Sequence, residues 1–329
     1  MEFLAVGDIV TDDFLRLKDA SVHCNVNNEE CEICMRWGDK IPYEFHKVVP
    51  AVGNASNAAV AAARLGLPSA LRAYVGRDAH GAQCLEVLRN EGVDTEYMVT
   101  QEGKFTNYHY VLWYESQRTI LVKHETFDYS PPTLASAPQW VYLSSLGENS
   151  LVYHNALLEW LKKYPEAKLA FQPGTFQMKM GKEALAAVYA RADIFFCNKE
   201  EAEKILGLPA GQDIKNLLNQ IRALGPKTAV ITDDKRGCYA MDASGAAVHC
   251  PRYPDTKEPY EITGAGDALA STTVVALSLG KELSEALRWG SVNASAVLQK
   301  IGAQEGLLNR EQLEKNLANP PSPFVVEPF

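Results

Sequence analysis

Thr263-Gly264-Ala265-Gly266-Asp267 precedes a run of small and apolar residues, Ala268 to Leu279, in this chain of 329 residues. The run has the length of a helix, and Gly280 supplies a stop signal after it. Two glycines before a helix let several backbone N–H groups point at one spot, and the helix N-terminus adds partial positive charge, so the stretch predicts an anion site. Asp267, in that first turn, either accepts a proton from an attacking hydroxyl or merely complements the helix dipole.

The composition is typical of a globular protein in water, with 47% hydrophobic and 22% charged residues. The net charge of −9 argues against a nucleic-acid partner, but it permits small anionic ligands, because local amide dipoles can outweigh the global charge. No segment approaches the ~20 apolar residues of a membrane span. Residues 1–7 predict a strand and a turn, without a basic segment or a cleavage site. We therefore expect a cytoplasmic protein with no membrane partner.

The seven cysteines fall into two groups. Four are scattered through apolar or amphipathic stretches and are expected to be buried thiols: Cys84, Cys197, Cys238 and Cys250. The other three, Cys24, Cys31 and Cys34, are clustered beside His23. Cys31 and Cys34 have the spacing of zinc ligands, but the second close pair of a zinc site is missing. We therefore expect a reduced surface cluster rather than a metal site.

Strand patterns followed by helix patterns recur along the chain. The apolar runs that predict strands are Trp140 to Leu143, Lys168 to Phe171, Asp193 to Cys197 and Thr228 to Thr232. Repeated strand-to-helix units imply parallel strands with right-handed crossovers, and hence an α/β fold with a doubly wound, mostly parallel sheet and helices on both faces. Ligands of such sheets bind beyond the carboxyl ends of the strands, where the Gly264–Asp267 turn belongs.

Two stretches, residues 14–47 and 104–124, interrupt the alternation of strand and helix patterns and predict a small β lid. The second reads as two β-runs, 106–114 and 118–124, joined by a turn at residues 115–117. The core is then 1–13, 48–103 and 125–329. The aromatic residues of the lid either cover a ligand or pack against a second subunit, which favours a homodimer through the lid; they are Tyr108, Tyr110, Trp113 and Tyr114.

Three motifs together resemble those of the ribokinase family of carbohydrate kinases, also called the PfkB family. They are Gly53-Asn54-Ala55-Ser56-Asn57 with the alanine-rich run to Gly66, Val75-Gly76-Arg77-Asp78-Ala79-His80-Gly81, and the closing block Glu261 to Asp267. The likeness extends from Gly7 to Gln304, except for residues 14–47. It implies a ribokinase-like fold and an ATP-dependent, magnesium-assisted transfer of phosphate to a hydroxymethyl group of a sugar or nucleoside.

The resemblance also implies roles for individual residues. Asp267 would be the general base, and the amides of Gly264, Ala265 and Gly266 would form the anion hole. The substrate would be bound by Asp12, Gly53, Asn54 and Asn57, and Glu148, near a strand end, is a further candidate for this contact. The nucleotide would lie against Asn198, Thr232, Gly237, Asn293 and Gly302, and Glu201 would act on Mg²⁺ through water.

Several of these residues have simpler alternatives. Asn57 also fits a helix N-cap, and Asn198 with Glu201 also fits a capping box. Glu261 replaces the Asp that helps to hold K⁺ in relatives activated by that ion, and its longer side chain argues against K⁺ activation. Asp233 stands where the family usually has a small residue, which implies a weaker or reshaped contact with the nucleotide. No histidine is assigned to the chemistry.

The sequence leaves two other functions to consider. A non-catalytic sensor of sugar or nucleotide would keep the fold but lack the base or the metal handling, and neither is visibly missing. A dehydrogenase would need Gly-x-Gly-x-x-Gly after the first strand, but Gly7 is followed by Asp8-Ile9-Val10. Within the kinases, the sequence leaves ribose, fructose, 2-keto-3-deoxygluconate and adenosine open as substrates.

Overall fold

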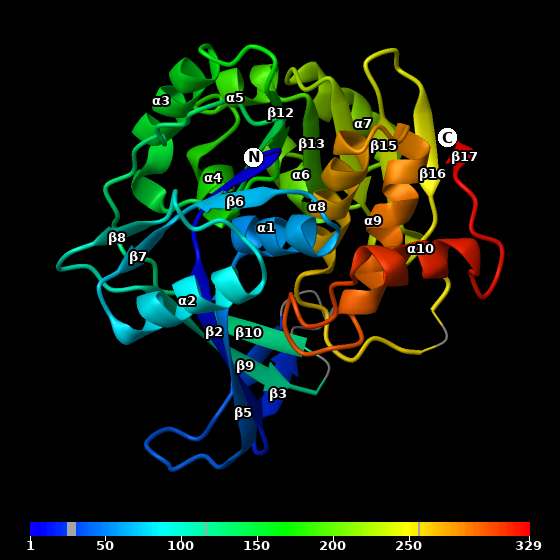
Figure 1. Cartoon of the computed structure of the whole chain (residues 1–329). Coiled ribbons are helices and arrows are strands. Elements are labelled where there is room, and N and C mark those ends of the chain that lie inside the picture. Colours follow the sequence, from blue (N-terminus) through cyan, green and yellow to red (C-terminus); the bar gives the residue numbers. More distant parts are fainter. Residues whose placement is uncertain (25–30, 116, 256) are drawn as a thin grey trace.

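A nine-stranded sheet forms the centre of the computed structural model, which describes residues 1–24, 31–115, 117–255 and 257–329 (Figure 1). The strands lie in the order β17 (Glu327–Pro328), β16 (Ala247–Cys250), β15 (Cys238–Met241), β14 (Thr228–Thr232), β13 (Ile194–Asn198), β12 (Lys168–Phe171), β11 (Trp140–Leu143), β1 (Phe3–Val6) and β6 (Ser69–Arg72). The six from β14 to β6 are parallel, and the last three in the chain are antiparallel. The doubly wound, mostly parallel sheet expected from the sequence is confirmed.

Helices cover both faces of this sheet, which explains why its parallel strands are continuously apolar. One core cluster joins the sheet to α1 (Asn54–Arg64), α2 (Ala79–Asn90), α8 (Ala265–Ser278), α9 (Leu283–Val297) and α10 (Arg310–Ala318). A second cluster, on the opposite face, joins it to α3 (Leu151–Leu161), α4 (Thr175–Met180), α5 (Ala186–Arg191), α6 (Lys199–Leu206) and α7 (Ile214–Ala223). No helix of the described residues is long and apolar enough to cross a membrane.

The four predicted core strands match the observed ones within one residue, whereas the lid strand predicted at 118–124 ends at Leu121. The runs at 140–143, 168–171 and 228–232 are strands with those bounds, and the fourth is displaced by one residue. Helix α8 starts at Ala265, three residues before the apolar run, and Gly264, in a left-handed conformation, is its N-cap. Asp267 is therefore the third residue of the helix.

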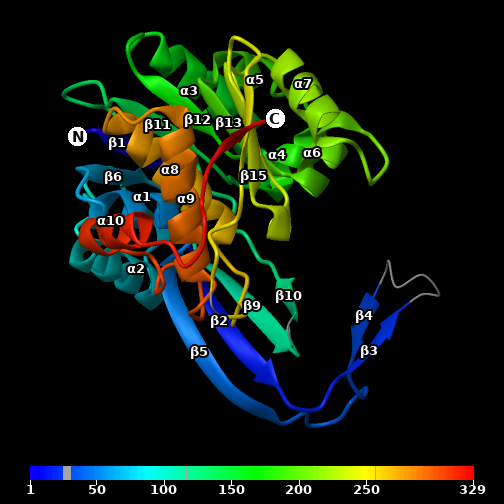
Figure 2. The ribbon, with the colours of Figure 1, turned by 90° about the vertical axis from the view of Figure 1, so that its right-hand side faces the viewer.

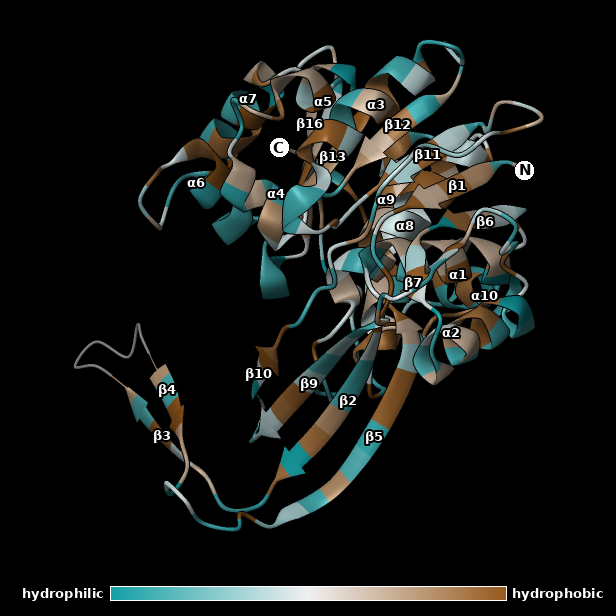
Figure 3. Cartoon of the chain, turned by 90° about the vertical axis from the view of Figure 1, so that its left-hand side faces the viewer, coloured by the Kyte–Doolittle hydropathy of each residue, from teal (hydrophilic) through white to brown (hydrophobic). Residues whose placement is uncertain are grey.

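A separate four-stranded sheet, the lid, extends below the core in the order β10 (Gln117–Leu121), β9 (Asn107–Tyr114), β2 (Val10–Leu17) and β5 (Tyr43–Val52). Its strands β2 and β5 extend into residues 10–13 and 48–52, which the sequence analysis assigns to the core. In Figure 3, β5 changes from brown beside the core to teal and white at its far end, in accord with its burial. A further two-stranded pair, β7 (Tyr74–Gly76) and β8 (Val99–Gln101), lies beside α2.

The strands of the lid present alternate residues to its two faces, as any β-strand does. The inner face, toward the core, carries Phe14 and Val111, which are almost fully buried and lie side by side in the sheet. The outer face carries the next row, Val48, Asp13, Tyr110 and Leu121. Trp113 therefore shares the inner face, whereas the three tyrosines of β9 belong to the outer one.

The segment between β2 and β5 forms a hairpin that we call the arm, β3 (Ser21–Cys24) with β4 (Cys31–Cys34), and it stands apart from the core (Figure 2). Cys24 lies directly opposite Cys31, and the two form a disulfide, so the expectation of a reduced cluster is wrong here. The sequence analysis did not predict this hairpin, and only the hairpin brings the two cysteines together. Cys34 lies three residues from Cys31 on one strand, so the two side chains point to opposite faces of the hairpin. The described residues contain no cluster of three or more metal-binding side chains.

Candidate active site

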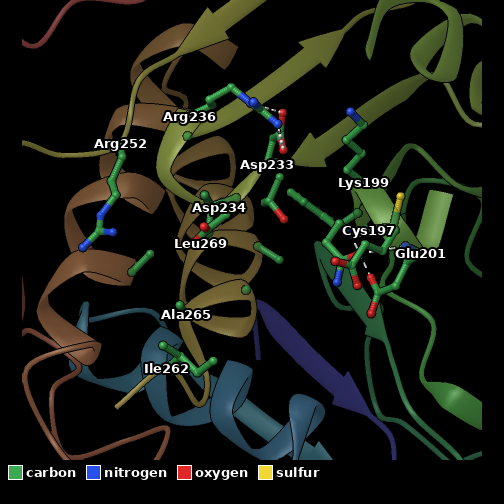
Figure 4. A pocket seen from close by; sticks show the side chains of 18 of the residues that line it. Cys197, Lys199, Glu201, Asp233, Asp234, Arg236, Arg252, Ile262, Ala265 and Leu269 are labelled. Carbon is green, nitrogen blue, oxygen red and sulfur yellow. Dashed lines mark hydrogen bonds and ion pairs between the residues drawn. The ribbon is translucent and has the colours of Figure 1, made fainter. Parts of the chain in front are cut away.

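A cavity of about 740 Å³ opens where the carboxyl ends of β13 and β14 meet the N-terminus of α8 (Figure 4). Carboxyl ends of parallel strands leave polar loops at one edge, which is where ligands bind in such sheets. Asn54, Gln172 and Asp267 line this cavity, together with Thr232, the last residue of β14, and Gly237, which follows that strand. The remaining wall comes from α6, α9 and the segment around Ile262.

Asp267 is held by amide side chains from two other segments. Asn57 donates to its Oδ2 atom at 2.8 Å, and Gln172 donates to its Oδ1 atom at 3.1 Å. The side chain of Asn54 also lowers the pKa of this carboxylate. Burial raises the pKa of Asp267 above its ordinary value, while these hydrogen bonds and the charge of Arg118 oppose that increase. A carboxylate that faces a cavity under such restraint is a fixed proton acceptor.

Gln172 is a site residue that the sequence analysis missed. It directly follows β12, so its place at the carboxyl end of a predicted strand was the signal that could have found it. Its Oε1 atom accepts a hydrogen bond from the hydroxyl of Tyr142, which orients the amide so that Nε2 points at Asp267.

Two of the three predicted anion-hole residues, Ala265 and Gly266, line the cavity. Gly264 does not; it has a φ of +83°, and a Cβ atom there would lie 2.4 Å from Cβ of Ala303. The place of Gly264 is therefore fixed by backbone conformation and by close packing. The first turn of α8 has unpaired N–H groups beside the cavity, as required for binding a phosphate.

Asp12 lies on the inner face of the lid and is paired with a histidine of the same face. Its Oδ1 atom is 3.3 Å from Nδ1 of His109, and each side chain is 13% exposed. The His109 ring lies 5.1 Å from that of His124, which in turn contacts Asp8 at 3.1 Å. The sequence analysis assigned no histidine to the site; the period of two along β9, which puts His109 on the face of Trp113, was the available signal.

The other predicted substrate residues have different surroundings. Gly53 is the N-cap of α1 and packs against the backbone of Asp8, and Asn54 begins the helix and lines the cavity. Asn57 is not an N-cap, because the helix starts three residues before it; its side chain serves Asp267 instead. Glu148 is exposed in a short 3-10 helix, Glu148–Ser150, and does not line the cavity.

Asn198 and Glu201 form the capping box that was the alternative to their functional role. Asn198 accepts from the Glu201 amide, and Glu201 accepts from the Asn198 amide through Oε2, each at 2.8 Å. Both residues also line the cavity, and Figure 4 shows Glu201 across from Asp233. Burial raises the pKa of Glu201, the hydrogen bond from Asn198 opposes this shift, and the charge of Asp267 adds to it. This repulsion between two carboxylates would be relieved by a cation near them.

The charges along the cavity are mainly negative. Its acidic residues are Glu200, Glu201, Glu203, Asp233, Asp234 and Asp267, and its basic residues are Lys199, Arg236 and Arg252. Asp233 pairs with Arg236 at 2.6 Å, so the acidic residue found in place of a small one is neutralised locally. A polyphosphate ligand would therefore need a divalent cation to balance its charge here, and Glu201 fits such a role.

The pattern of the pfkB family carbohydrate kinases matches residues 33–310 of the chain. The chain belongs to this family. It is 28% identical over 271 residues to the ribokinase of Bacillus subtilis, covering 81% of this chain and 87% of that protein. The structure of Arabidopsis thaliana ribokinase complexed with ribose and ATP is similar with a TM-score of 0.80 at 20% identity, covering 97% of this chain and 99% of that one. The nucleoside kinase of Methanocaldococcus jannaschii is similar with a TM-score of 0.77 at 18% identity, covering 96% and 98%.

Two predicted nucleotide residues of this pfkB kinase lie outside the cavity. Asn293 is completely buried; it donates to Thr272 and accepts from the Leu308 amide, each within 2.9 Å, so it serves the packing of α8 and α9. The sequence placed the correct helix, but Ser291, Ala294 and Ser295 are the residues of α9 that line the cavity. Gly302 does not line the cavity either; its amide donates to Glu261 at 3.3 Å.

Proposed function

We propose that this pfkB kinase transfers the γ-phosphoryl group of ATP to a hydroxymethyl group of a sugar or nucleoside, with Asp267 as the general base. The observation that carries the proposal is the Asp267 carboxylate, which lines the cavity two residues after the start of α8 and accepts hydrogen bonds from the amide side chains of Asn57 and Gln172. One turn of helix thus supplies both a proton acceptor and the N–H groups that face the transferred phosphate.

The nucleotide is proposed to occupy the part of the cavity between α6, the segment after β14 and α9. Asn198, Thr232 and Gly237 line this part, together with Ser291 and Ser295. Mg²⁺, when bound, bridges the phosphates and neutralises their charge; Glu201 would hold it through water. The acidic lining supports a metal-nucleotide complex as the ligand, because a free polyphosphate would be repelled.

The acceptor is proposed to lie between Asp267 and the inner face of the lid. Asp12 accepts hydrogen bonds from sugar hydroxyls, and its pair with His109 orients the carboxylate for a diol. Asn54 and Gly53 form the other side of this pocket. Asp267 then removes the proton of the hydroxymethyl group while the amides of Ala265 and Gly266 stabilise the developing charge on the phosphoryl group.

The test is an assay of ADP formation over ribose, fructose, 2-keto-3-deoxygluconate and adenosine, made with the wild type and with Asp267→Asn. We expect turnover with at least one acceptor and a loss of about 10²–10⁴-fold in kcat for the variant. Glu200→Gln, an exposed acid of the same cavity, is the matched control and should keep its activity. Unchanged turnover in Asp267→Asn would reject the role of the base, and binding without turnover for every acceptor would favour a sensor.

A further inference from the structure

Glu261 is a buried carboxylate in the loop that leads into the anion hole. Its side chain is 4% exposed, and it accepts hydrogen bonds from the amide and hydroxyl of Thr263 and from the Gly302 amide. A carboxylate removed from water in this way needs a positive counter-charge as well as hydrogen bonds. The nature of that counter-charge decides what holds this loop in place.

The counter-charge comes from the lid. Nη1 of Arg118, on β10, lies 3.1 Å from Oε1 of Glu261, and the arginine side chain is 24% exposed. Within the described part of the chain, this is the one ion pair that Glu261 makes. The two residues are 143 positions apart in the sequence, so the pair joins two distant parts of the fold.

A second lid side chain contacts the residue next to Glu261. Trp113 lies opposite Arg118 in the β9–β10 ladder, and its ring meets the edge of Tyr260 with centroids 5.5 Å apart. Arg16, opposite Trp113 on β2, stacks over the indole at 4.5 Å. One row across the inner face of the lid therefore contacts two consecutive residues of the loop.

The loop connects this contact to the turn Gly264–Asp267 at the start of α8, which we call the catalytic turn because of its proposed role. Only Ile262 and Thr263 separate Glu261 from Gly264, whose backbone packs against Ala303. Glu261 also bonds the amide of Gly302, which is the neighbour of that alanine. A displacement of the Glu261 side chain would thus act on both segments that confine the N-terminus of α8.

We propose that Arg118 is a positioning residue: its ion pair with Glu261 couples the seating of the lid to the geometry of the anion hole, and its guanidinium does the work that a bound monovalent cation could otherwise do. The inference rests on the proposed function, since it assigns the amides of Ala265 and Gly266 to the transferred phosphate. Its physical basis is that reacting groups misplaced by about 1 Å lose about 10²-fold in rate.

The first experiment does not depend on turnover. Amide hydrogen exchange of the segment 260–268 is compared between the full-length wild type and Arg118→Met. We expect faster exchange in the variant. Arg77→Met, which removes a surface ion pair with Glu102, is the matched control and should leave exchange of this segment unchanged. Equal protection of the segment in Arg118→Met and in the wild type would overturn the proposal, whatever the acceptor turns out to be.

The second experiment uses kinetics with an acceptor that the wild type phosphorylates. We expect kcat of Arg118→Met to fall by about 10²-fold with the KM for ATP little changed, since positioning rather than binding is lost. Guanidinium chloride at a concentration too low to unfold the protein should restore part of kcat in the variant and not in the wild type. The wild type should be equally active in potassium and in tetramethylammonium chloride. A wild type that requires K⁺, or a variant with wild-type kcat, would overturn the proposal. A wild type without any turnover would reject the proposed function instead. In that case the hydrogen-exchange experiment would still test whether Arg118 positions the loop.

Discussion

At the scale of single residues, the site depends on amides that orient one carboxylate. The sequence predicted Asp267, Asn54 and Asn57 through the spacing of two glycine-rich motifs, but it did not predict what Asn57 contacts. Gln172 lay outside every motif. It becomes a site residue only because the parallel sheet sets the end of β12 beside the N-terminus of α8, a relation between residues 95 positions apart that no local pattern contains.

The pH dependence of turnover follows from these contacts. Gln172→Met removes a donor to the ionised carboxylate but keeps the length of the side chain. Because burial raises the pKa of Asp267 and the hydrogen bond from Gln172 lowers it, the variant should have a higher pKa than the wild type. The base works only when ionised, so kcat should fall at a higher pH as the solution is acidified.

This prediction is checked by measuring kcat from about pH 5 to about pH 9 in both proteins. Tyr142→Phe, which keeps Gln172 but removes the hydroxyl that orients it, should shift the acid limb less. An acid limb that stays in place, or moves to lower pH, would contradict the assigned role of Gln172.

Two glycines of the catalytic turn should respond differently to alanine. Gly264→Ala puts a Cβ atom against Ala303 at a φ of +83°, so we expect a loss of about 1–3 kcal/mol in the free energy of unfolding. Gly266 lies in the helix with no atom within 4 Å of an added Cβ, so Gly266→Ala should be neutral or stabilising by up to about 1 kcal/mol. Urea unfolding measures both; equal effects of the two substitutions would contradict this account of the turn.

At the scale of elements, the strands of the core were predictable and the connections were not. A short continuous apolar run such as Trp140–Leu143 predicts a strand that is covered on both faces, and the observed strand ends where the run ends. Asp267 was placed in the first turn of α8, but the apolar run alone did not give the first residue of the helix, because Gly264 adopts a left-handed conformation and is the N-cap. The arm was not predicted as a hairpin, since its strands are short and exposed and no packed core fixes them.

The arm gives a direct test of its cysteine pairing. Protein unfolded without reductant should take up five iodoacetamide groups, one for each free cysteine, and seven after reduction. Because every residue of β3 is exposed, reduction should leave the midpoint of thermal unfolding of the core unchanged. Mass spectrometry and a thermal scan measure the two effects. Seven labels without reductant would show that Cys24 and Cys31 are thiols in solution.

At the scale of the whole molecule, the outer face of the lid exposes large hydrophobic side chains on neighbouring strands. Tyr110 and Leu121 are exposed there, and Val48 belongs to the same row. The sequence analysis favoured a homodimer through the lid, and this face is the surface that such a dimer would bury. We predict a particle of twice 36.2 kDa in light scattering, and a shift toward the monomer in Tyr110→Asp. A monomeric wild type would contradict the prediction.

Residue-level motifs thus predicted the family and the edge of the sheet at which the cavity lies, while contacts across the fold decided the rest. Asn293 illustrates the limit: its helix was placed correctly, but which side of the helix faces the cavity depends on how α9 packs against α8. The same holds for Arg118, because its ion pair with Glu261 depends on how the lid packs against the loop.

Because alternate residues of the lid strands face the core and the outer side, the length of these strands cannot change freely. Deleting or adding one residue within β9 would exchange the rows, sending Tyr110 toward the core and His109 toward water. The arm lies where such a change costs least: the chain leaves β2 after Leu17 and returns to β5 at Tyr43, at the far end of the lid. The pairing of β2 with β5 shifts by one residue just there, between Arg16 and Leu17, so the row that carries Asp12 keeps its partners.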